Sequence, residues 1–347
     1  MRPQPKEDRT SLHFLVYAPR SGSTFFADAL SRACPNLLVV PEFRTVEFLL
    51  ARPEAYVKNL RPRELARLMA ADRQLIPNLG IQKTQQRLLA EQLAGGGSNE
   101  IISGIVAAYA GDSPLVVRKV LLKLSGALKF PKRLPELSPE VRVIEVYRDG
   151  RGVVNSLLTT PKAYFPSETM GRDDVVYCAN VWNRHVAVSQ DSAFKFGARL
   201  LRLRYEDLLE DLDSGLKGAA HLLDLPNLRT GQIQTPYTIG DTERPLHPRV
   251  GLERQVERAT AWETELGSQR GVVAELLMRD ELRLLGYKPY FVQGRPTIRN
   301  PSILMHARLR HAAGTANYFA RRLWQHRFRG SELYEHCRAR FMAKVHR

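Results

Sequence analysis

The sequence predicts an α/β fold with a mainly parallel central sheet covered by helices on both faces. Short apolar runs alternate with longer helical patterns between residues 11 and 290. Strands that are apolar along their whole length are typical of a sheet buried on both faces, and strands that alternate with helices are usually parallel. The first run also ends in a turn-rich polar loop that leads directly into a helical pattern. We therefore expect three layers, with the sheet between two layers of helices.

Five strands are expected in chain order, each from a short apolar or alternating run. They lie at residues 12–17, 37–40, 115–120, 141–147 and 200–205. Helical periodicity fills much of the sequence between and after them, and prolines punctuate its longest stretch. The helical stretches lie at residues 25–32, 44–93, 150–158, 172–196 and 262–285.

Charge and composition suggest three parts of the chain. The 347 residues carry a formal net charge of +16, with 52 Lys and Arg against 36 Asp and Glu. Such an excess favours an anionic partner: a nucleotide, an acidic glycan, nucleic acid or a membrane surface. Arginines are frequent and acids rare near the carboxyl terminus. We expect a polar arm at residues 1–10, one domain at 11–290 and a basic helical extension at 291–347.

The extension has two interpretations. Phe319, Leu323, Trp324 and Phe328 would form an apolar stripe beside the arginines of a helix. A helix of this kind suits docking on an anionic membrane surface or an acidic acceptor. The same pattern suits a helical subdomain packed on the core or a contact between copies of the chain, and the sequence leaves both open.

The cysteines and the first residues set expectations about the compartment. Cys34, Cys178 and Cys337 are widely spaced and form no CxxC pair, so neither a disulfide framework nor a zinc site is indicated, and no metal is expected. The polar first residues do not resemble a signal peptide, and no apolar run reaches the roughly 18 residues of a membrane span. These features predict a cytoplasmic protein that is at most peripheral to a membrane.

A phosphate-binding loop is indicated directly after the first strand, in the segment PRSGST. Gly22 lets the backbone approach an anion, and the N–H groups and positive dipole end of the following helix favour phosphate there. Ser21, Ser23 and Thr24 bring hydroxyl groups, and Arg20 brings a fork of N–H donors that suits phosphate or sulfate oxygens. The segment lacks the GK[ST] of a nucleotide triphosphate loop. A polar turn that caps a helix is the structural alternative.

A second anion site is indicated where the fourth expected strand runs into RDGRGVVNS. Arg148 supplies a cation at the start of a helix, and Ser156 would lie almost two turns into that helix. A surface ion pair of Arg148 with Asp149 is the structural alternative. The two segments together predict a nucleotide with two separated phosphate groups.

The two segments resemble the donor-binding motifs of sulfotransferases that use 3′-phosphoadenosine 5′-phosphosulfate (PAPS). PRSGST resembles the loop that cradles the 5′-phosphosulfate, and its arginine is closer to carbohydrate-acting and bacterial members than to phenol-acting ones, which usually carry lysine. RDGRGVVNS resembles the 3′-phosphate motif RDPRxxxxS, with Gly150 in place of the proline. RYEDL at 204–208, Trp262 and LLGY at 284–287 resemble later segments of the family. The resemblance covers roughly residues 10–290.

This resemblance implies a P-loop-like fold and the transfer of a sulfonate group from PAPS to an acceptor hydroxyl, with PAP as product and no metal. A hydroxyl of a glycan or glycolipid is the first expectation for the acceptor, and a small phenol or alcohol the second. The donor-binding positions of the family fall on Arg20, Ser21, Gly22, Ser23, Thr24, Arg148 and Ser156.

Three residues are candidates for the chemistry. Glu42 follows the second expected strand, where carbohydrate sulfotransferases often place a catalytic glutamate, and is the first candidate for the general base; an exposed or capping carboxylate is the alternative. Lys119, on the third expected strand, resembles a family lysine that approaches the bridging oxygen, and Arg118 competes for this role. His185 is a further candidate base, although a lone histidine on a long helix is more often structural.

Two other classes of protein are alternatives to a sulfotransferase. A P-loop kinase for a small molecule would need a lysine inside the loop and an acidic residue for Mg²⁺. A module that binds nucleic acid or an anionic surface would explain the positive charge. The aromatic residues, however, lack the spacing of an RNA-binding motif, and no helix-turn-helix or zinc-finger signature is present. Nucleic acid is therefore not expected as the main partner.

Overall fold

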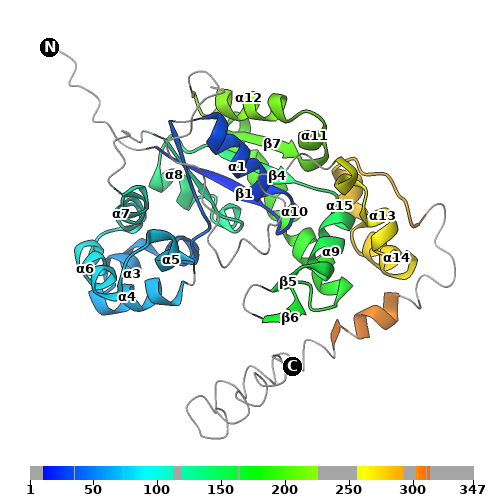
Figure 1. Cartoon of the computed structure of the whole chain (residues 1–347), viewed down its shortest axis with the longest axis horizontal. Helices are drawn as coiled ribbons and strands as arrows, with labels where there is room; N and C mark the ends of the chain where they lie inside the picture. Colours follow the sequence, from blue (N-terminus) through cyan, green and yellow to red (C-terminus); the bar gives the residue numbers. More distant parts are fainter. Residues whose placement is uncertain are drawn as a thin grey trace, which may run out of the picture. The chain divides into compact units, whose positions relative to one another are not determined.

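The computed structural model describes residues 11–34, 36–72, 74–111, 119–162, 165–225, 256–292, 302, 304–309 and 311–312 (Figure 1). Within these residues the chain forms two compact units. The first combines Met1–Arg148 with Arg184–Ala259, and the second combines Asp149–Asn183 with Thr260–Arg347. The long helix α10, Val175–Phe196, contributes residues to both.

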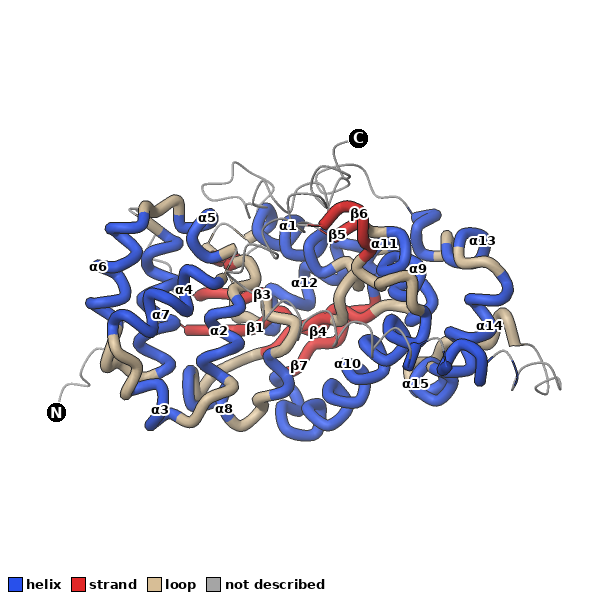
Figure 2. The backbone as a smooth tube through the Cα atoms, turned by 90° about the horizontal axis from the view of Figure 1, so that it is seen from below, coloured by secondary structure: helices blue, strands red, loops and turns tan. Residues whose placement is uncertain are grey.

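The first unit contains the parallel sheet. In the described chain, five strands run parallel in the order β2-β3-β1-β4-β7, so the first strand lies at the centre (Figures 1 and 2). The strands are β1 Ser11–Tyr17, β2 Leu37–Val40, β3 Lys119–Lys123, β4 Val143–Tyr147 and β7 Leu200–Arg204. Leu15 of β1 aligns with Lys123 of β3, and Tyr17 of β1 aligns with Val146 of β4. The α/β class expected from the sequence is confirmed.

Alternate residues of the strands pack into two hydrophobic cores, one on each face of the sheet. On β1, Phe14 and Val16 belong to one core and Leu15 to the other, as the pleat of a strand requires. The Leu15 core is completed by side chains of α1 and α12, and the other core by side chains of α2 to α8 and the end of α10. The helices of this unit are α1 Ser23–Ala33, α2 Arg44–Leu50, α3 Glu54–Lys58, α4 Pro62–Ala71, α5 Leu75–Leu79, α6 Lys83–Leu93, α7 Ser98–Ala110, α8 Arg133–Leu137, α11 Tyr205–Glu210 and α12 Leu212–Leu222, with the 3₁₀ turns η1 Ala127–Lys129, η2 Gly197–Arg199 and η4 Val256–Ala259.

Prolines divide the stretch that was expected to be mostly helical at residues 44–93. Pro53 precedes α3 and Pro62 opens α4. The first N–H groups of a helix have no partner within the helix, so proline loses nothing at these positions. A proline inside a helix would lose a backbone hydrogen bond, so new helices begin just after Pro53 and at Pro62 instead of continuing the preceding one.

The third strand lies later in the chain than the sequence predicts. β3 runs from Lys119 to Lys123, whereas the strand was expected at residues 115–120. Residues 112–118, with Arg118 among them, lie outside the described residues. Residues 120–122 are buried between β1 and β2. Lys119 therefore stands at the amino end of the strand and Lys123 at its carboxyl end.

The second unit departs from the expected elements at two places. No sequence pattern predicts the short antiparallel pair of β5 and β6. The stretch at 262–285 forms three helices of the described chain, with Gly267 (φ 73°) between the first two. The elements of this unit are α9 Gly150–Thr159, β5 Pro161–Lys162, β6 Phe165–Thr169, α13 Trp262–Glu265, α14 Ser268–Leu277 and α15 Arg279–Leu284.

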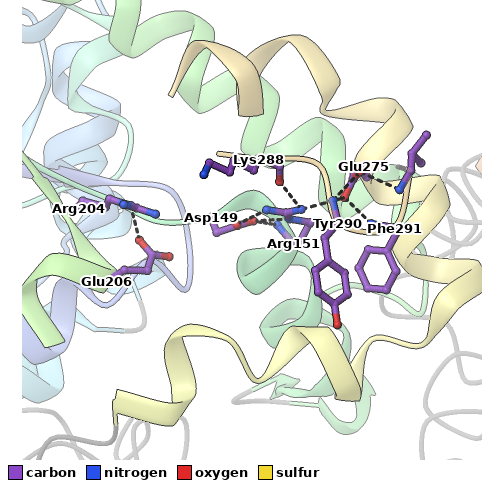
Figure 3. A network of polar contacts seen from close by, with 9 residues as sticks. Asp149, Arg151, Arg204, Glu206, Glu275, Lys288, Tyr290 and Phe291 are labelled. Atoms are coloured by element: carbon purple, nitrogen blue, oxygen red, sulfur yellow. Dashed lines mark hydrogen bonds and ion pairs between the residues drawn. The ribbon is translucent and has the colours of Figure 1, made fainter. Parts of the chain in front are cut away.

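A buried arginine holds the second unit together. Arg151 of α9 is 3% exposed and forms ion pairs with Asp149 at 2.7 Å and Glu275 at 2.8 Å (Figure 3). Its guanidinium carbon also lies 4.0 Å from the centre of the Trp262 ring. A buried charge is tolerated only when it is paired and hydrogen-bonded, and here two carboxylates and an aromatic face surround it. The network thereby joins α9 to α14.

Glu275 also binds the backbone that follows α15. The N–H groups of Tyr290, Phe291 and Val292 donate to its carboxylate at 3.0–3.1 Å (Figure 3). The chain up to residue 292 therefore packs within this unit. The boundary expected at residue 290 stays a prediction.

The basic extension is described only at its start. Residues 304–309 are helical, whereas the apolar stripe expected from Phe319, Leu323, Trp324 and Phe328 lies outside the described residues. No helix in the described part of the chain combines the length and apolar character needed to span a membrane.

His13 of β1 should make the first unit sensitive to acid. Its side chain is 2% exposed, and burial, reinforced by the positive charges of Lys119 and Arg142, lowers the pKa of its imidazole to about 4. The unfolded chain binds this proton near pH 6.5, so it gains protons that the folded chain excludes. We expect this group to lower the free energy of unfolding by up to about 3 kcal/mol as the pH falls from 6.5 to 4.

Urea unfolding of the parent chain and of His13→Gln across this pH range measures the effect. The variant should show a smaller decrease in the free energy of unfolding. An identical decrease in both proteins would contradict the assignment to His13.

Candidate functional site

The loop after β1 lies at the centre of the carboxyl edge of the sheet. Because the strands are parallel, their carboxyl ends meet at this edge, where β1 has β3 on one side and β4 on the other. The loop turns through Arg20 and Gly22, which both have positive φ (70° and 87°), before α1 begins at Ser23. This backbone suits glycine and is strained at Arg20. The amino end of α1, whose N-cap is Gly22, favours an anion.

Tyr205 and Arg148 hold this loop in place. A Cβ on Gly22 would lie 2.1 Å from Cδ2 of Tyr205, so the aromatic ring occupies the space that any side chain at residue 22 would need. The guanidinium of Arg148 stacks on the same ring, 4.6 Å from its centre. It donates hydrogen bonds to the backbone oxygens of Arg20 at 3.3 Å and Arg258 at 2.7 Å. The first unit thus brings Arg20, Gly22 and Arg148 together.

The hydroxyl side chains of the loop are buried. Ser21 is fully buried, and its Oγ has no hydrogen-bond partner in the described part of the chain. Ser23 and Thr24 open α1 and are 4% and 6% exposed. A buried hydroxyl without a partner is unfavourable by about 1–3 kcal/mol. A ligand oxygen in the loop would remove this cost.

The lysine beside the loop is Lys123. It ends β3, is 6% exposed, and donates from Nζ to Oγ1 of Thr24 at 3.0 Å. The same nitrogen lies 4.8 Å from the centre of the Tyr17 ring. These two contacts hold the ammonium group of Lys123 beside the first turn of α1.

Lys119, the lysine selected from the sequence, lies at the opposite edge of the sheet. Its Nζ donates to the backbone oxygens of Leu223 and Asp224, the latter at 2.9 Å, and so stabilises the carboxyl end of α12. Four residue steps along a strand separate it from Lys123 by about 13 Å. This placement does not fit the role expected for Lys119, because the loop is at the other end of the strand.

Two hydroxyl groups hold the carboxylate of Glu42, which lies in the connection between β2 and α2. Tyr17, at the end of β1, donates to Oε2 at 2.5 Å. Ser125, just after β3, donates to Oε1 at 2.8 Å. Glu42 therefore lies at the same edge of the sheet as the loop. Its role as a base stays a prediction.

His185 belongs to a buried network around Glu145, in the middle of β4. Its Nε2 lies 3.0 Å from Oε1 of Glu145, while Ser189 and Arg202 donate to Oε2 at 2.6 Å and 2.7 Å. Burial by itself raises the pKa of Glu145, but the hydrogen bonds of His185 and Ser189 and the charges of His185 and Arg202 outweigh burial and lower it. These contacts place His185 with β4 rather than with the loop.

Ser156 lies in the second turn of α9. Asp149 caps the amino end of this helix, where it accepts a hydrogen bond from the N–H of Arg151 at 2.8 Å. Arg148 belongs to the first unit and Ser156 to the second. Their joint contact with one phosphate stays a prediction from the motif.

The packing of α9 explains the glycine at residue 150. A Cβ on Gly150 would lie 2.7 Å from Sδ of Met278 and 2.8 Å from Cδ2 of Trp182. These two side chains fill the space that the proline of the family motif would need. The departure from RDPRxxxxS is therefore a matter of packing in the second unit.

This arrangement suits the transfer of an anionic group to a hydroxyl. Lys123 and Arg148 supply positive charge, and Ser21 and Thr24 supply hydroxyls, at the start of a helix that favours anions. Glu42, held at the same edge, can accept a proton. The donor set thus fits a phosphate or phosphosulfate group.

No local sequence pattern identifies three further residues at this edge of the sheet: Tyr17, Lys123 and Ser125. Each lies at or just after the carboxyl end of a strand, and in a parallel sheet such residues meet beside the loop of the central strand. The signal exists in the sequence, but it depends on placing the third strand to within two or three residues.

Replacing Gly22 with alanine should destabilise the protein more than replacing Gly80. Both glycines have positive φ (87° and 64°), so each variant carries strain of about 1 kcal/mol. At Gly22 the new methyl group also meets the Tyr205 ring, which should add about 1–3 kcal/mol. Nothing lies within 4 Å of a Cβ on Gly80. Urea unfolding measures both losses, and equal losses would show that the ring moves aside freely.

Comparisons with known proteins identify the family and the fold of this chain. A model of the sulfotransferase family matches residues 14–229, more than half of the chain. The sulfotransferase domain from the curacin biosynthetic pathway has the same fold, with a TM-score of 0.55 and 16% identity over 81% of this chain and 99% of that chain. The sulfotransferase domain from the Synechococcus PCC 7002 olefin synthase has a TM-score of 0.54 and 16% identity over 82% and 98%. No curated protein matches the sequence. On the strength of the family match, this chain belongs to the sulfotransferase family.

Proposed function

We propose that the chain transfers a sulfonate group from PAPS to an acceptor hydroxyl. The observation that carries this proposal is the pairing of opposite charges at the carboxyl edge of the sheet. The buried ammonium of Lys123 contacts the ring of Tyr17, and the carboxylate of Glu42 contacts its hydroxyl. A transfer of this kind needs positive charge at the anionic donor and a base at the acceptor.

The donor side of the proposal assigns residues 20–24 to the 5′-phosphosulfate. The unpartnered hydroxyl of Ser21 and the glycine at residue 22 support this assignment. Arg148 and Ser156 are assigned to the 3′-phosphate, on the basis of the RDGRGVVNS motif. Two separated phosphate sites favour PAPS over a donor with a single phosphate group.

In the proposed reaction PAPS supplies an activated sulfonate and leaves as PAP. Glu42 takes the proton of the acceptor hydroxyl while the acceptor oxygen forms its bond to sulfur and the bond from sulfur to the bridging phosphate oxygen breaks. In this proposal Lys123 stabilises the negative charge that develops on the bridging oxygen. Lys123 is thus proposed for the role that the sequence predicted for Lys119.

A hydroxyl of a glycan or glycolipid is the proposed acceptor, and a small phenol or alcohol is the second class. The arginine of PRSGST and the position of Glu42 support the first. Incubation with labelled PAPS and a panel of glycans, lipids and phenols identifies the class that accepts the sulfonate.

The basic extension is proposed to contact an anionic membrane surface from the cytoplasmic side. Met305 and Leu309, one turn apart on the helical residues 304–309, are 63% and 64% exposed, and Arg308 beside them is also exposed. Exposed apolar side chains next to a cation are typical of a helix that lies on a membrane surface.

PAP should stabilise the chain against thermal unfolding without Mg²⁺, and ATP should not.

Arg148→Ala should weaken PAP binding by roughly tenfold or more, because a fork of donors to a phosphate is lost. Arg148→Lys should recover part of the affinity, since it restores the charge without the fork. Calorimetry measures the affinities, with Arg63→Ala on the exposed face of α4 as control. Unchanged PAP affinity in Arg148→Ala would remove the 3′-phosphate assignment.

Glu42→Gln should abolish measurable turnover and leave PAP binding nearly intact. The amide keeps the shape of the side chain but cannot take a proton, and general-base catalysis contributes about 10²–10⁴-fold to a rate. Steady-state turnover and PAP calorimetry on the same preparation test this. Turnover close to that of the parent chain would exclude Glu42 from the mechanism.

A further inference from the structure

Tyr17 contacts both charged groups of the proposed site. Its hydroxyl donates to Oε2 of Glu42 at 2.5 Å, and its ring lies 4.8 Å from Nζ of Lys123. The side chain ends β1 and is 5% exposed, so the central strand of the sheet fixes its position. A single buried residue thus sets the spacing between the cation and the carboxylate.

We propose that Tyr17 is a positioning residue that orients the Glu42 carboxylate for proton transfer, with Ser125 as its partner hydroxyl. The inference rests on the proposed function, in which Glu42 is the base. It adds two residues that contact Glu42 directly and act through it.

The geometry of the carboxylate supports this role. Tyr17 and Ser125 donate to different oxygens of Glu42, at 2.5 Å and 2.8 Å. A carboxylate has about four acceptor directions, so two hydroxyl donors fix its plane and still leave room for the acceptor hydroxyl. Both donors are anchored next to strands, while Glu42 lies in the connection between β2 and α2. The strands therefore provide the precision that a side chain on a connecting segment lacks.

The two contacts of the Tyr17 side chain, its hydroxyl with Glu42 and its ring with Lys123, can be tested separately. Tyr17→Phe keeps the ring against Lys123 and removes only the hydroxyl, whereas Tyr17→Leu removes both contacts. We expect Tyr17→Phe to lower kcat by about tenfold, the effect of one hydrogen bond to a charged group, and to leave PAP affinity within about twofold. Tyr17→Leu should weaken PAP binding as well, because Lys123 loses its aromatic contact.

A split between kcat and KM distinguishes positioning from a purely structural role. Tyr17→Phe and Ser125→Ala should each lower kcat and leave the KM for PAPS within about twofold, because the two hydroxyls act on proton transfer through the carboxylate and not on donor binding. An unchanged kcat in both single variants, or a rise in the KM for PAPS that accounts for the whole loss of kcat/KM, would overturn the proposal.

The contact can also be measured without turnover. In urea unfolding, the losses caused by Tyr17→Phe and Glu42→Ala should be smaller together than their sum, since both remove the hydrogen bond between the two side chains. Strictly additive losses would show that the two side chains do not interact and would overturn the positioning role. If the parent chain neither binds PAP nor turns over any acceptor of the panel, the proposed function fails, and this cycle still decides the Tyr17–Glu42 contact. Ser125→Ala with Glu42→Ala provides the same test if Tyr17→Phe does not fold.

Discussion

The parallel alignment of β1 between β3 and β4 is the constraint on which the candidate site depends. Parallel strands end at the same edge, so the residues that end β1 and β3 and that follow β2 are brought together although they are far apart in sequence. The Leu15–Lys123 alignment places Lys123 within reach of the first turn of α1. The same alignment leaves Lys119 at the other edge, on the carboxyl end of α12. One strand therefore carries one lysine with a structural role and one at the site.

Buried charges in this protein contact groups of opposite charge, hydroxyl groups and aromatic faces. Glu145 and Arg151 are enclosed by groups of opposite charge: Arg202 contacts Glu145, and Asp149 and Glu275 contact Arg151. Such ion pairs hold strands and helices in place. Around the loop, Lys123 contacts a hydroxyl and an aromatic face, and the neighbouring hydroxyl of Ser21 has no partner in the described chain. An anionic group in the loop would give the Ser21 hydroxyl an acceptor.

Two glycines show how packing and motif are linked. At Gly22 the ring of Tyr205 occupies the place of a side chain, and Arg148 stacks on that ring. The glycine of the loop, the arginine after β4 and the tyrosine of RYEDL thus form one packed group, although they come from three separate segments. At Gly150 the neighbours are Trp182 and Met278, which occupy the space that the proline of the motif RDPRxxxxS would need.

The sequence by itself determined the α/β class, the strand–loop–helix segment at residues 20–24 and the approximate position of Glu42, because these depend on local patterns of apolar, turn and polar residues. The tertiary structure alone decided which lysine stands beside the loop, since a shift of a few residues in the start of β3 exchanges the two ends of the strand. It also decided that Tyr17 and Ser125 hold Glu42 and that His185 serves Glu145. These contacts join residues 25, 83 and 40 positions apart. Only the register of the strands and the packing of helices on them set such contacts, and no local pattern encodes them.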